Sequence, residues 1–174
     1  MGAALALARP DVTALVVRGA ARALTDLGYA CVTEAPLANG RRADLVGIGP
    51  GGELVIVEVK SGLEDYRADR KWRFYEAFCD AFYFAVPPEF PEDRLPLDPG
   101  LIVADRFGGA VLREAERHAL APARRKAMTL MLARLAAQRA LRLAQPAPAP
   151  RAVFEEGEAY VIDAPSDEPA PDHL

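Results

Sequence analysis

Apolar residues recur at helical spacing near the start of the chain and then give way to short apolar runs. Between residues 12 and 27 they repeat every three or four positions, which predicts an amphipathic helix ending at Gly28. Three segments that follow predict strands: residues 29–33, 43–48 and 54–59. Asn39-Gly40 and residues 49–52 are typical turn sequences between them, so we predict a helix followed by a three-stranded meander.

The pattern changes again in the second half of the chain. Residues 64–80 combine charged and aromatic side chains and are predicted as one helix, and residues 81–86 form an apolar strand. Two short strands and a last helix opened by Pro122 complete the prediction: residues 101–104, 110–112 and 122–145. Because a helix separates the third and fourth strands, those strands are expected to run parallel. We therefore predict an α/β fold, with a mixed central sheet flanked by helices.

Charge and proline divide the chain of 174 residues into two parts. Residues 146–174 hold six prolines, seven acids and one base. The net charge of this segment is −6, whereas that of the whole chain is −4, so the rest of the chain is slightly basic. A proline-rich acidic segment with few large apolar residues predicts disorder. We therefore expect a folded domain over residues 8–145 and a disordered C-terminal tail. The small apolar patch at residues 159–162 could dock on the domain or on a repair or replication protein, or be an ordinary part of the tail.

Several classes of protein are excluded by composition. No apolar run approaches the roughly 18 residues that a membrane-spanning helix needs, and the N-terminus lacks the pattern of a secretory signal. Cys31 and Cys79 form no CxxC pair, which argues against a disulfide framework and a structural zinc site. We expect a soluble, cytoplasmic protein with no membrane partner.

Three charged residues interrupt the apolar strands. Glu58 is the only polar residue within strand 54–59, and Lys60, two positions later, points to the same face. Asp44 opens the preceding strand, and pairing around Gly51 would place it opposite Glu58. Two carboxylates with an ammonium group suit Mg²⁺ or Mn²⁺, which bind carboxylates together with water and phosphate oxygens. The alternative is a structural Glu58–Lys60 ion pair at the end of a strand.

Asp44, Glu58 and Lys60 on a helix–strand–strand–strand frame resemble the PD-(D/E)xK nuclease superfamily. Several segments more narrowly resemble the MmcB-type DNA repair family of bacteria: residues 40–44, 57–61, 65–72, 79–86 and 124–129. The resemblance implies a restriction-endonuclease-like core and a role in DNA repair. It also implies that Asp44, Glu58 and the backbone carbonyl of Val59 hold a metal ion, while Lys60 assists the attacking water.

The chain departs from the superfamily pattern at three positions. Ala43, not proline, precedes Asp44, and Lys71 stands where some relatives carry a glutamine four residues before Tyr75. The first helix also lacks the glutamate that often completes the metal site. Glu34, at the end of the first predicted strand, is the nearest substitute, with an exposed strand-end acid as the equal alternative.

Basic side chains flank the predicted metal site and open the last helix. Those closest to the site in sequence are candidate DNA contacts: Arg41, Arg42, Arg70, Lys71 and Arg73. Arg124, Arg125 and Lys126 begin a stretch that has no acid between Glu116 and Glu155. This stretch could follow a phosphate backbone or form the solvated side of an amphipathic helix. Trp72 and Tyr75 could stack on bases or pack in the core.

These observations leave three functional hypotheses. The first is a Mg²⁺- or Mn²⁺-dependent endonuclease that hydrolyses phosphodiester bonds of DNA during repair. The second is a DNA-binding or scaffolding repair factor that keeps the nuclease fold with little or no activity. The third is an interaction module that acts through the acidic tail. A homodimer formed through the last helix is compatible with each of them.

Overall fold

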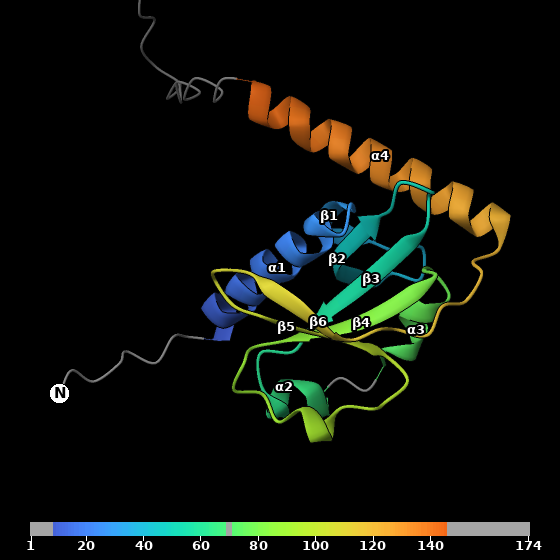
Figure 1. Cartoon of the computed structure of the whole chain (residues 1–174). Helices are drawn as coiled ribbons and strands as arrows, with labels where there is room; N and C mark the ends of the chain where they lie inside the picture. The colour runs from blue at the N-terminus through green and yellow to red at the C-terminus, as the bar shows by residue number, and fades with distance from the viewer. Residues whose placement is uncertain (1–8, 69–70, 146–174) are drawn as a thin grey trace, which may run out of the picture.

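The computed structural model describes residues 9–68 and 71–145, which form a mixed α/β domain (Figure 1). The elements follow in this order: α1 (Arg9–Asp26), β1 (Ala30–Pro36), β2 (Arg42–Ile48), β3 (Leu54–Val59), α2 (Leu63–Ala68), α3 (Arg73–Glu76), β4 (Ala81–Val86), the 3₁₀ helix η1 (Glu92–Arg94), β5 (Gly100–Ala104), β6 (Gly109–Arg113) and α4 (Pro122–Ala144). The tail predicted to be disordered, residues 146–174, lies outside the described residues.

The six strands lie side by side in sequence order, from β1 to β6. β1, β2 and β3 pair antiparallel, as predicted for a meander, and β5 pairs antiparallel with β6. β3 and β4 run parallel, because the chain crosses over between them through α2 and α3. The mixed sheet flanked by helices is confirmed, and the order α1-β1-β2-β3-α-β4 is the one expected for a restriction-endonuclease-like core.

α1 covers one face of the sheet because one side of this helix is apolar. Val16, Ala20 and Leu24 recur every four residues and are buried in a cluster that includes Val57 of β3. The helix ends at Asp26, and two residues later Gly28 has a φ of +87°, a backbone conformation that glycine adopts without strain. The N-terminal helix and its glycine stop are therefore confirmed.

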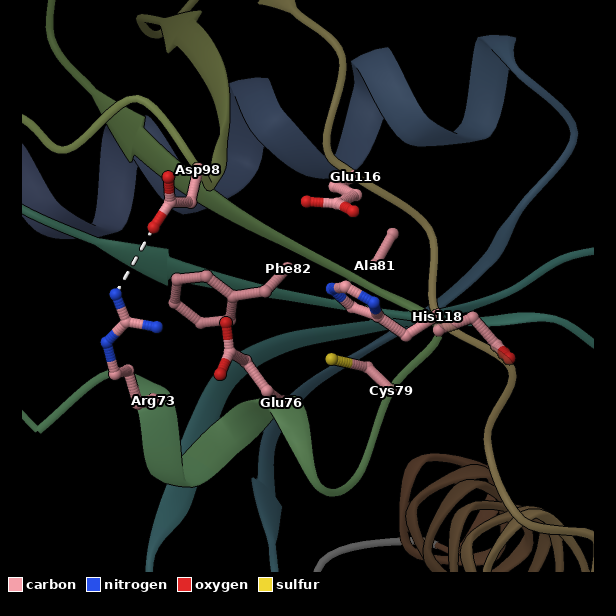
Figure 2. A pocket seen from close by; sticks show the side chains of 9 residues that line it. Arg73, Glu76, Cys79, Ala81, Phe82, Asp98, Glu116 and His118 are labelled. Atoms are coloured by element: carbon pink, nitrogen blue, oxygen red, sulfur yellow. Dashed lines mark hydrogen bonds and ion pairs between the residues drawn. The ribbon is translucent and has the colours of Figure 1, made fainter.

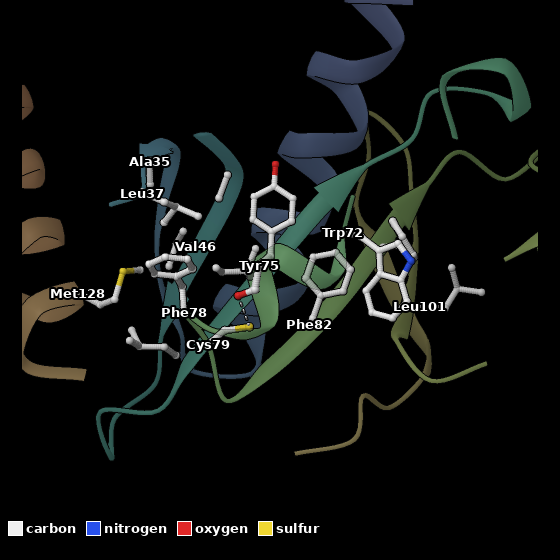
Figure 3. Close-up of a cluster of buried hydrophobic side chains, with 14 of the residues drawn as sticks. Ala35, Leu37, Val46, Trp72, Tyr75, Phe78, Cys79, Phe82, Leu101 and Met128 are labelled. Atoms are coloured by element: carbon white, nitrogen blue, oxygen red, sulfur yellow. Dashed lines mark hydrogen bonds between the residues drawn. The ribbon is translucent and has the colours of Figure 1, made fainter. Parts of the chain in front are cut away.

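An aromatic cluster fills the opposite face of the sheet (Figure 3). Phe82 of β4 stacks on Trp72 with ring centroids 5.5 Å apart and meets Phe84 edge-on at 5.2 Å. Met128 of α4 lies in the same cluster and reaches toward Phe78 in Figure 3. These rings and the inner side of α4 form the second half of the hydrophobic core.

The single helix predicted for residues 64–80 is wrong, because this segment forms two short helices, α2 and α3. Around α3 the backbone bonds join residues three apart, from Tyr75 N to Trp72 O and from Phe78 N to Tyr75 O, at 2.9 and 2.8 Å. A turn of three residues brings Trp72, Tyr75 and Phe78 to one side of the segment. Packing of these three rings on the sheet therefore decides the local backbone.

No helix in the described part of the chain is long and apolar enough to span a membrane.

Candidate active site

Asp44 and Glu58 lie opposite each other on neighbouring strands. The register pairs Leu45 with Val57, so the next residues outward, Asp44 on β2 and Glu58 on β3, face each other across the ladder. The N–H of Val59 donates to Asp44 Oδ2 at 2.8 Å. The predicted pairing around the β2–β3 turn therefore occurs, and it places both carboxylates on the face of the sheet that carries the aromatic cluster.

Glu58 and Lys60 are buried together at the end of β3. Their exposed fractions are 7% and 3%, and Lys60 Nζ lies 3.6 Å from Glu58 Oε1. The backbone N–H of Lys60 donates to the carbonyl of Ala85 at 2.9 Å, so the parallel β4 holds this residue in line with the strand. The buried side chain of Lys60 therefore has a carboxylate partner beside it.

The surroundings of Asp44 disfavour its ionised form. Burial is the main cause and raises the pKa of Asp44, while the Val59 N–H lowers it. The negative charges of Glu34 and Asp65 raise the pKa further, and the positive charge of Lys60 opposes them. The site therefore gathers negative charge around a half-buried acid, which is an environment that a bound cation would relieve.

Asp65 is a neighbour that the sequence prediction missed. It lies in α2, and its Oδ2 accepts hydrogen bonds from the N–H and the hydroxyl of Ser61, at 3.0 and 3.2 Å. These bonds tie the start of α2 to the residue that follows Lys60. The available signal was the position of an acid five residues after that lysine, at the start of a predicted helix.

Glu34 lies beside Asp44 but turns toward another partner. In the β1–β2 register it falls between the pairs Thr33–Leu45 and Ala35–Ala43, and is therefore opposite Asp44. Its φ of +49° is rare for a residue other than glycine, and its carboxylate forms an exposed ion pair with Arg42 Nε. A role for Glu34 as a metal ligand stays a prediction.

The donor set fits a magnesium-type ion held by few protein ligands. Asp44 and Glu58 offer carboxylate oxygens, and Mg²⁺ commonly binds one or two carboxylates together with waters and substrate phosphates. Within residues 9–68 and 71–145, no group of three or more His, Cys, Asp or Glu side chains is placed to hold a metal ion. A metal site at Asp44 and Glu58 that water and substrate complete stays a prediction. The Val59 carbonyl stays a predicted ligand.

The basic residues predicted near the site gather around α3 and the β1–β2 turn. The guanidinium of Arg41 lies over the ring of Phe74 at 4.9 Å, and that of Arg73 lies over Trp72 at 4.5 Å. Arg73 also forms an exposed ion pair with Asp98 at 3.2 Å. Lys71 is exposed, whereas Arg70 lies outside the described residues. Their contact with DNA stays a prediction.

Arg125 binds a buried carboxylate at the opposite end of the sheet. Its guanidinium donates to both oxygens of Asp80, at 2.7 and 2.6 Å, and to the carbonyl of Gly52 at 2.8 Å. Leu54 N and Leu120 N also donate to Asp80, at 2.7 and 3.0 Å. Burial alone would raise the pKa of Asp80, but these donors outweigh it and lower the pKa to about 2.

The other predicted contacts on α4 lie at this same end of the sheet. Arg124 donates to the carbonyl of Ala77 at 3.1 Å and lies over the ring of Phe78, and Lys126 is exposed. The start of β3 is four residues from Glu58, about 13 Å along a strand. The structure therefore separates residues 124–126 from the two carboxylates, and their DNA contact stays a prediction.

A small pocket opens near the start of β4 (Figure 2). Its volume is about 210 Å³, below the range typical of ligand sites, and Glu76, Glu116 and His118 line it. Burial raises the pKa of the Cys79 thiol in its wall to about 12. A thiol that stays protonated at neutral pH is a poor nucleophile, so this pocket does not compete with the carboxylates as an active site.

Comparisons with known proteins identify the family of the chain. A solved structure of a protein of unknown function from Silicibacter pomeroyi is 38% identical in sequence and superposes with a TM-score of 0.76, covering 87% of this chain and 100% of that chain. No curated protein matches the chain. The family model for MmcB-like DNA repair proteins matches residues 3–147, which supports a role in DNA repair. The chain therefore belongs to the MmcB-like DNA repair family.

Proposed function

We propose that the protein is a metal-dependent endonuclease that hydrolyses phosphodiester bonds of DNA during repair. The observation that carries this proposal is the juxtaposition of Asp44, Glu58 and Lys60 on one face of the sheet. With all three groups ionised, two carboxylates and one ammonium group sum to a charge of −1, which favours a cation in the site. The membership of the chain in a DNA repair family supports DNA as the substrate.

Each residue has a distinct role in this proposal. A Mg²⁺ or Mn²⁺ ion held by Asp44, Glu58 and the Val59 carbonyl would polarise the scissile phosphate and lower the pKa of an attacking water. The Val59 N–H orients Asp44 through the bond to Oδ2. The ammonium group of Lys60, held beside Glu58, would neutralise the charge that develops on the phosphate.

A cleavage assay with matched variants tests the proposal. Labelled single-stranded, duplex, forked and nicked DNA would be incubated with the full chain in Mg²⁺, in Mn²⁺ and in EDTA. Glu58→Gln and Lys60→Met keep the shape of each side chain and remove its charge. Glu116→Gln removes an exposed acid at the other end of the sheet and serves as the control. We expect metal-dependent cutting by the wild type and the control, and about 100-fold or greater loss in both site variants.

A second candidate is a DNA-binding repair factor without nuclease activity. The finding that favours it is that the described residues place no third acid, histidine or cysteine with Asp44 and Glu58 to hold a metal. The same assay separates the two candidates. Salt-sensitive DNA binding without cutting, equal in the wild type and in Glu58→Gln, would reject the nuclease and leave the binding factor.

A further inference from the structure

Phe74 is an exposed aromatic residue within an otherwise buried aromatic segment. Trp72 and Tyr75, at its sides, are buried, whereas 57% of Phe74 is exposed. The three-residue spacing of Trp72, Tyr75 and Phe78 turns those rings to the sheet and leaves Phe74 on the outer side. An exposed ring contributes little to the core and is accessible to another molecule.

The contacts of Phe74 hold it beside the β1–β2 turn. The guanidinium of Arg41 lies 4.9 Å from the ring centroid, and Asn39 Nδ2 donates to the carbonyl of Phe74 at 3.4 Å. Asn39 Oδ1 also accepts from the N–H of Arg41 at 3.1 Å, so one turn residue positions both members of the pair. The Arg41–Phe74 pair is therefore a fixed cationic and aromatic surface.

This surface lies on the approach to the two carboxylates. Tyr75 Oη donates to the carbonyl of Arg42 at 3.2 Å and fixes α3 against the start of β2. Asp44 follows three residues after Arg41, about 10 Å along an extended chain. Both α3 and the carboxylates belong to the same face of the sheet. A strand whose phosphate reaches Asp44 and Glu58 would thus pass the Arg41–Phe74 pair.

We infer that Phe74 stacks on an unpaired nucleobase of DNA while Arg41 contacts the adjacent phosphate, an inference that rests on the proposed function. In a duplex, both faces of a base are stacked on its neighbours, so a protein ring reaches a base only where the strand is single or locally unpaired. The substrate class of this site is therefore single-stranded DNA or a junction with an unpaired segment. Exposed Lys71 and Arg73 on the same segment add positive charge for the backbone.

The chain supplies a matched control for this pair. Phe107 is 72% exposed, and the guanidinium of Arg106 lies 4.5 Å from its ring centroid. This second pair follows β5 and lines a pocket with Val12 and Val16 of α1, on the other face of the sheet. This pair combines the same two residue types as the Arg41–Phe74 pair, but it lies on the face of the sheet that does not carry the two carboxylates.

The test measures DNA binding in EDTA, where cutting cannot interfere. Fluorescence anisotropy would follow the full chain on a labelled single strand, on the same sequence as a duplex, and on an abasic strand that keeps the phosphates. We expect Phe74→Ala to weaken binding to the single strand by roughly 5- to 150-fold. Its effect on the duplex and on the abasic strand, and the effect of Phe107→Ala on every probe, should stay within about two-fold.

Two further variants separate stacking from misfolding. Phe74→Tyr keeps a ring and should bind like the wild type. Phe74→Trp places an indole at this position, and its fluorescence should be quenched by the single strand but not by the abasic strand, whereas Phe107→Trp should not respond. The inference is overturned if Phe74→Ala binds like the wild type, loses affinity equally for all probes, or is matched by Phe107→Ala. If the protein binds in this way but does not cut DNA, the proposed nuclease activity is contradicted while the stacking site is supported.

Discussion

The two ends of the central sheet each hold a carboxylate beside a basic side chain, yet the two sites differ in how the charge is balanced. At the start of β4, Asp80 accepts from two backbone N–H groups and from a bidentate guanidinium, and its pKa falls to about 2. At the other end, Asp44 accepts from Val59 N, and burial with nearby acids raises its pKa.

This difference separates a carboxylate that stabilises the fold from the one that we propose as a metal ligand. Asp80 joins the start of β3, the segment before α4 and α4 itself, so its ionised form stabilises the fold. Asp44 is held with other acids at some expense of stability, a condition common at sites that bind ligands. Four experiments would sharpen or break this contrast.

The largest effect is expected for Asp44→Asn on DNA cleavage. The amide keeps an oxygen to accept from Val59 N but loses the charge that would hold a metal ion. Mutating a residue that only hydrogen-bonds to a metal ligand often lowers activity about 10- to 100-fold. Loss of a ligand itself should therefore lower the cleavage rate constant by more than about 100-fold. Urea unfolding in EDTA should show equal or greater stability than the wild type. Full activity would show that Asp44 is not a ligand.

Asp80→Asn should act on stability. The neutral side chain loses the charge-assisted bonds from Arg125. It also leaves one of the backbone donors, Leu54 N or Leu120 N, facing an amide NH₂ group. We expect a loss of about 2–3 kcal/mol in the free energy of unfolding, below the range for a fully buried pair because the Arg125 side chain is 32% exposed. Asp98→Asn, in an exposed pair with Arg73, is the control, with a change below about 0.5 kcal/mol. Equal losses in both variants would contradict the structural role of Asp80.

Asp80 and Asp44 should make the stability of the fold depend on pH in opposite directions. The folded pKa of Asp80, about 2, lies below the ordinary value of 3.8, so its contribution is present above pH 3.8 and is lost as the pH falls toward 2. The pKa of Asp44 is raised, so its contribution is lost as the pH rises above 3.8. The free energy of unfolding would be measured in EDTA at a series of pH values. Its fall between pH 3.8 and 2 should be smaller in Asp80→Asn than in the wild type. At neutral pH, the free energy of unfolding should be higher in Asp44→Asn than in the wild type.

The smallest effect concerns the metal ion itself. Mg²⁺ at ten times its dissociation constant should add about 1.4 kcal/mol to the free energy of unfolding, because it binds the folded state. Asp80→Asn should keep this increment and Asp44→Asn should lose it. Isothermal titration calorimetry on the same proteins gives the constant needed for the comparison, and an increment retained in Asp44→Asn would place the ion elsewhere.

The candidate site could be predicted from sequence because its geometry is local. A short turn fixes the β2–β3 register, and the two-residue alternation of strands then decides the face of Glu58 and Lys60. The strand limits 54–59 and 81–86 were predicted correctly for a similar reason, since apolar runs and turn residues mark them.

The Asp80–Arg125 contact could not be predicted in the same way. These residues are 45 positions apart, and the sequence contains no pattern that joins them before the sheet and α4 are assembled. The exposure of Phe74 was not predicted, because the pattern of residues 64–80 indicated one continuous helix, whereas packing of Trp72, Tyr75 and Phe78 on the sheet gives backbone bonds between residues three apart. In both cases tertiary packing overrides what the local sequence indicates.

The left-handed backbone at Glu34 has a consequence for the outer edge of the sheet. β1 is an outer strand of the sheet, and an outer strand with open carbonyls can pair with another chain and begin aggregation. Here Arg139 of α4 donates to the carbonyls of Thr33 and Glu34, at 2.6 and 3.2 Å. The irregular strand and Arg139 together occupy two carbonyls of this edge, which makes pairing with a further strand less favourable there.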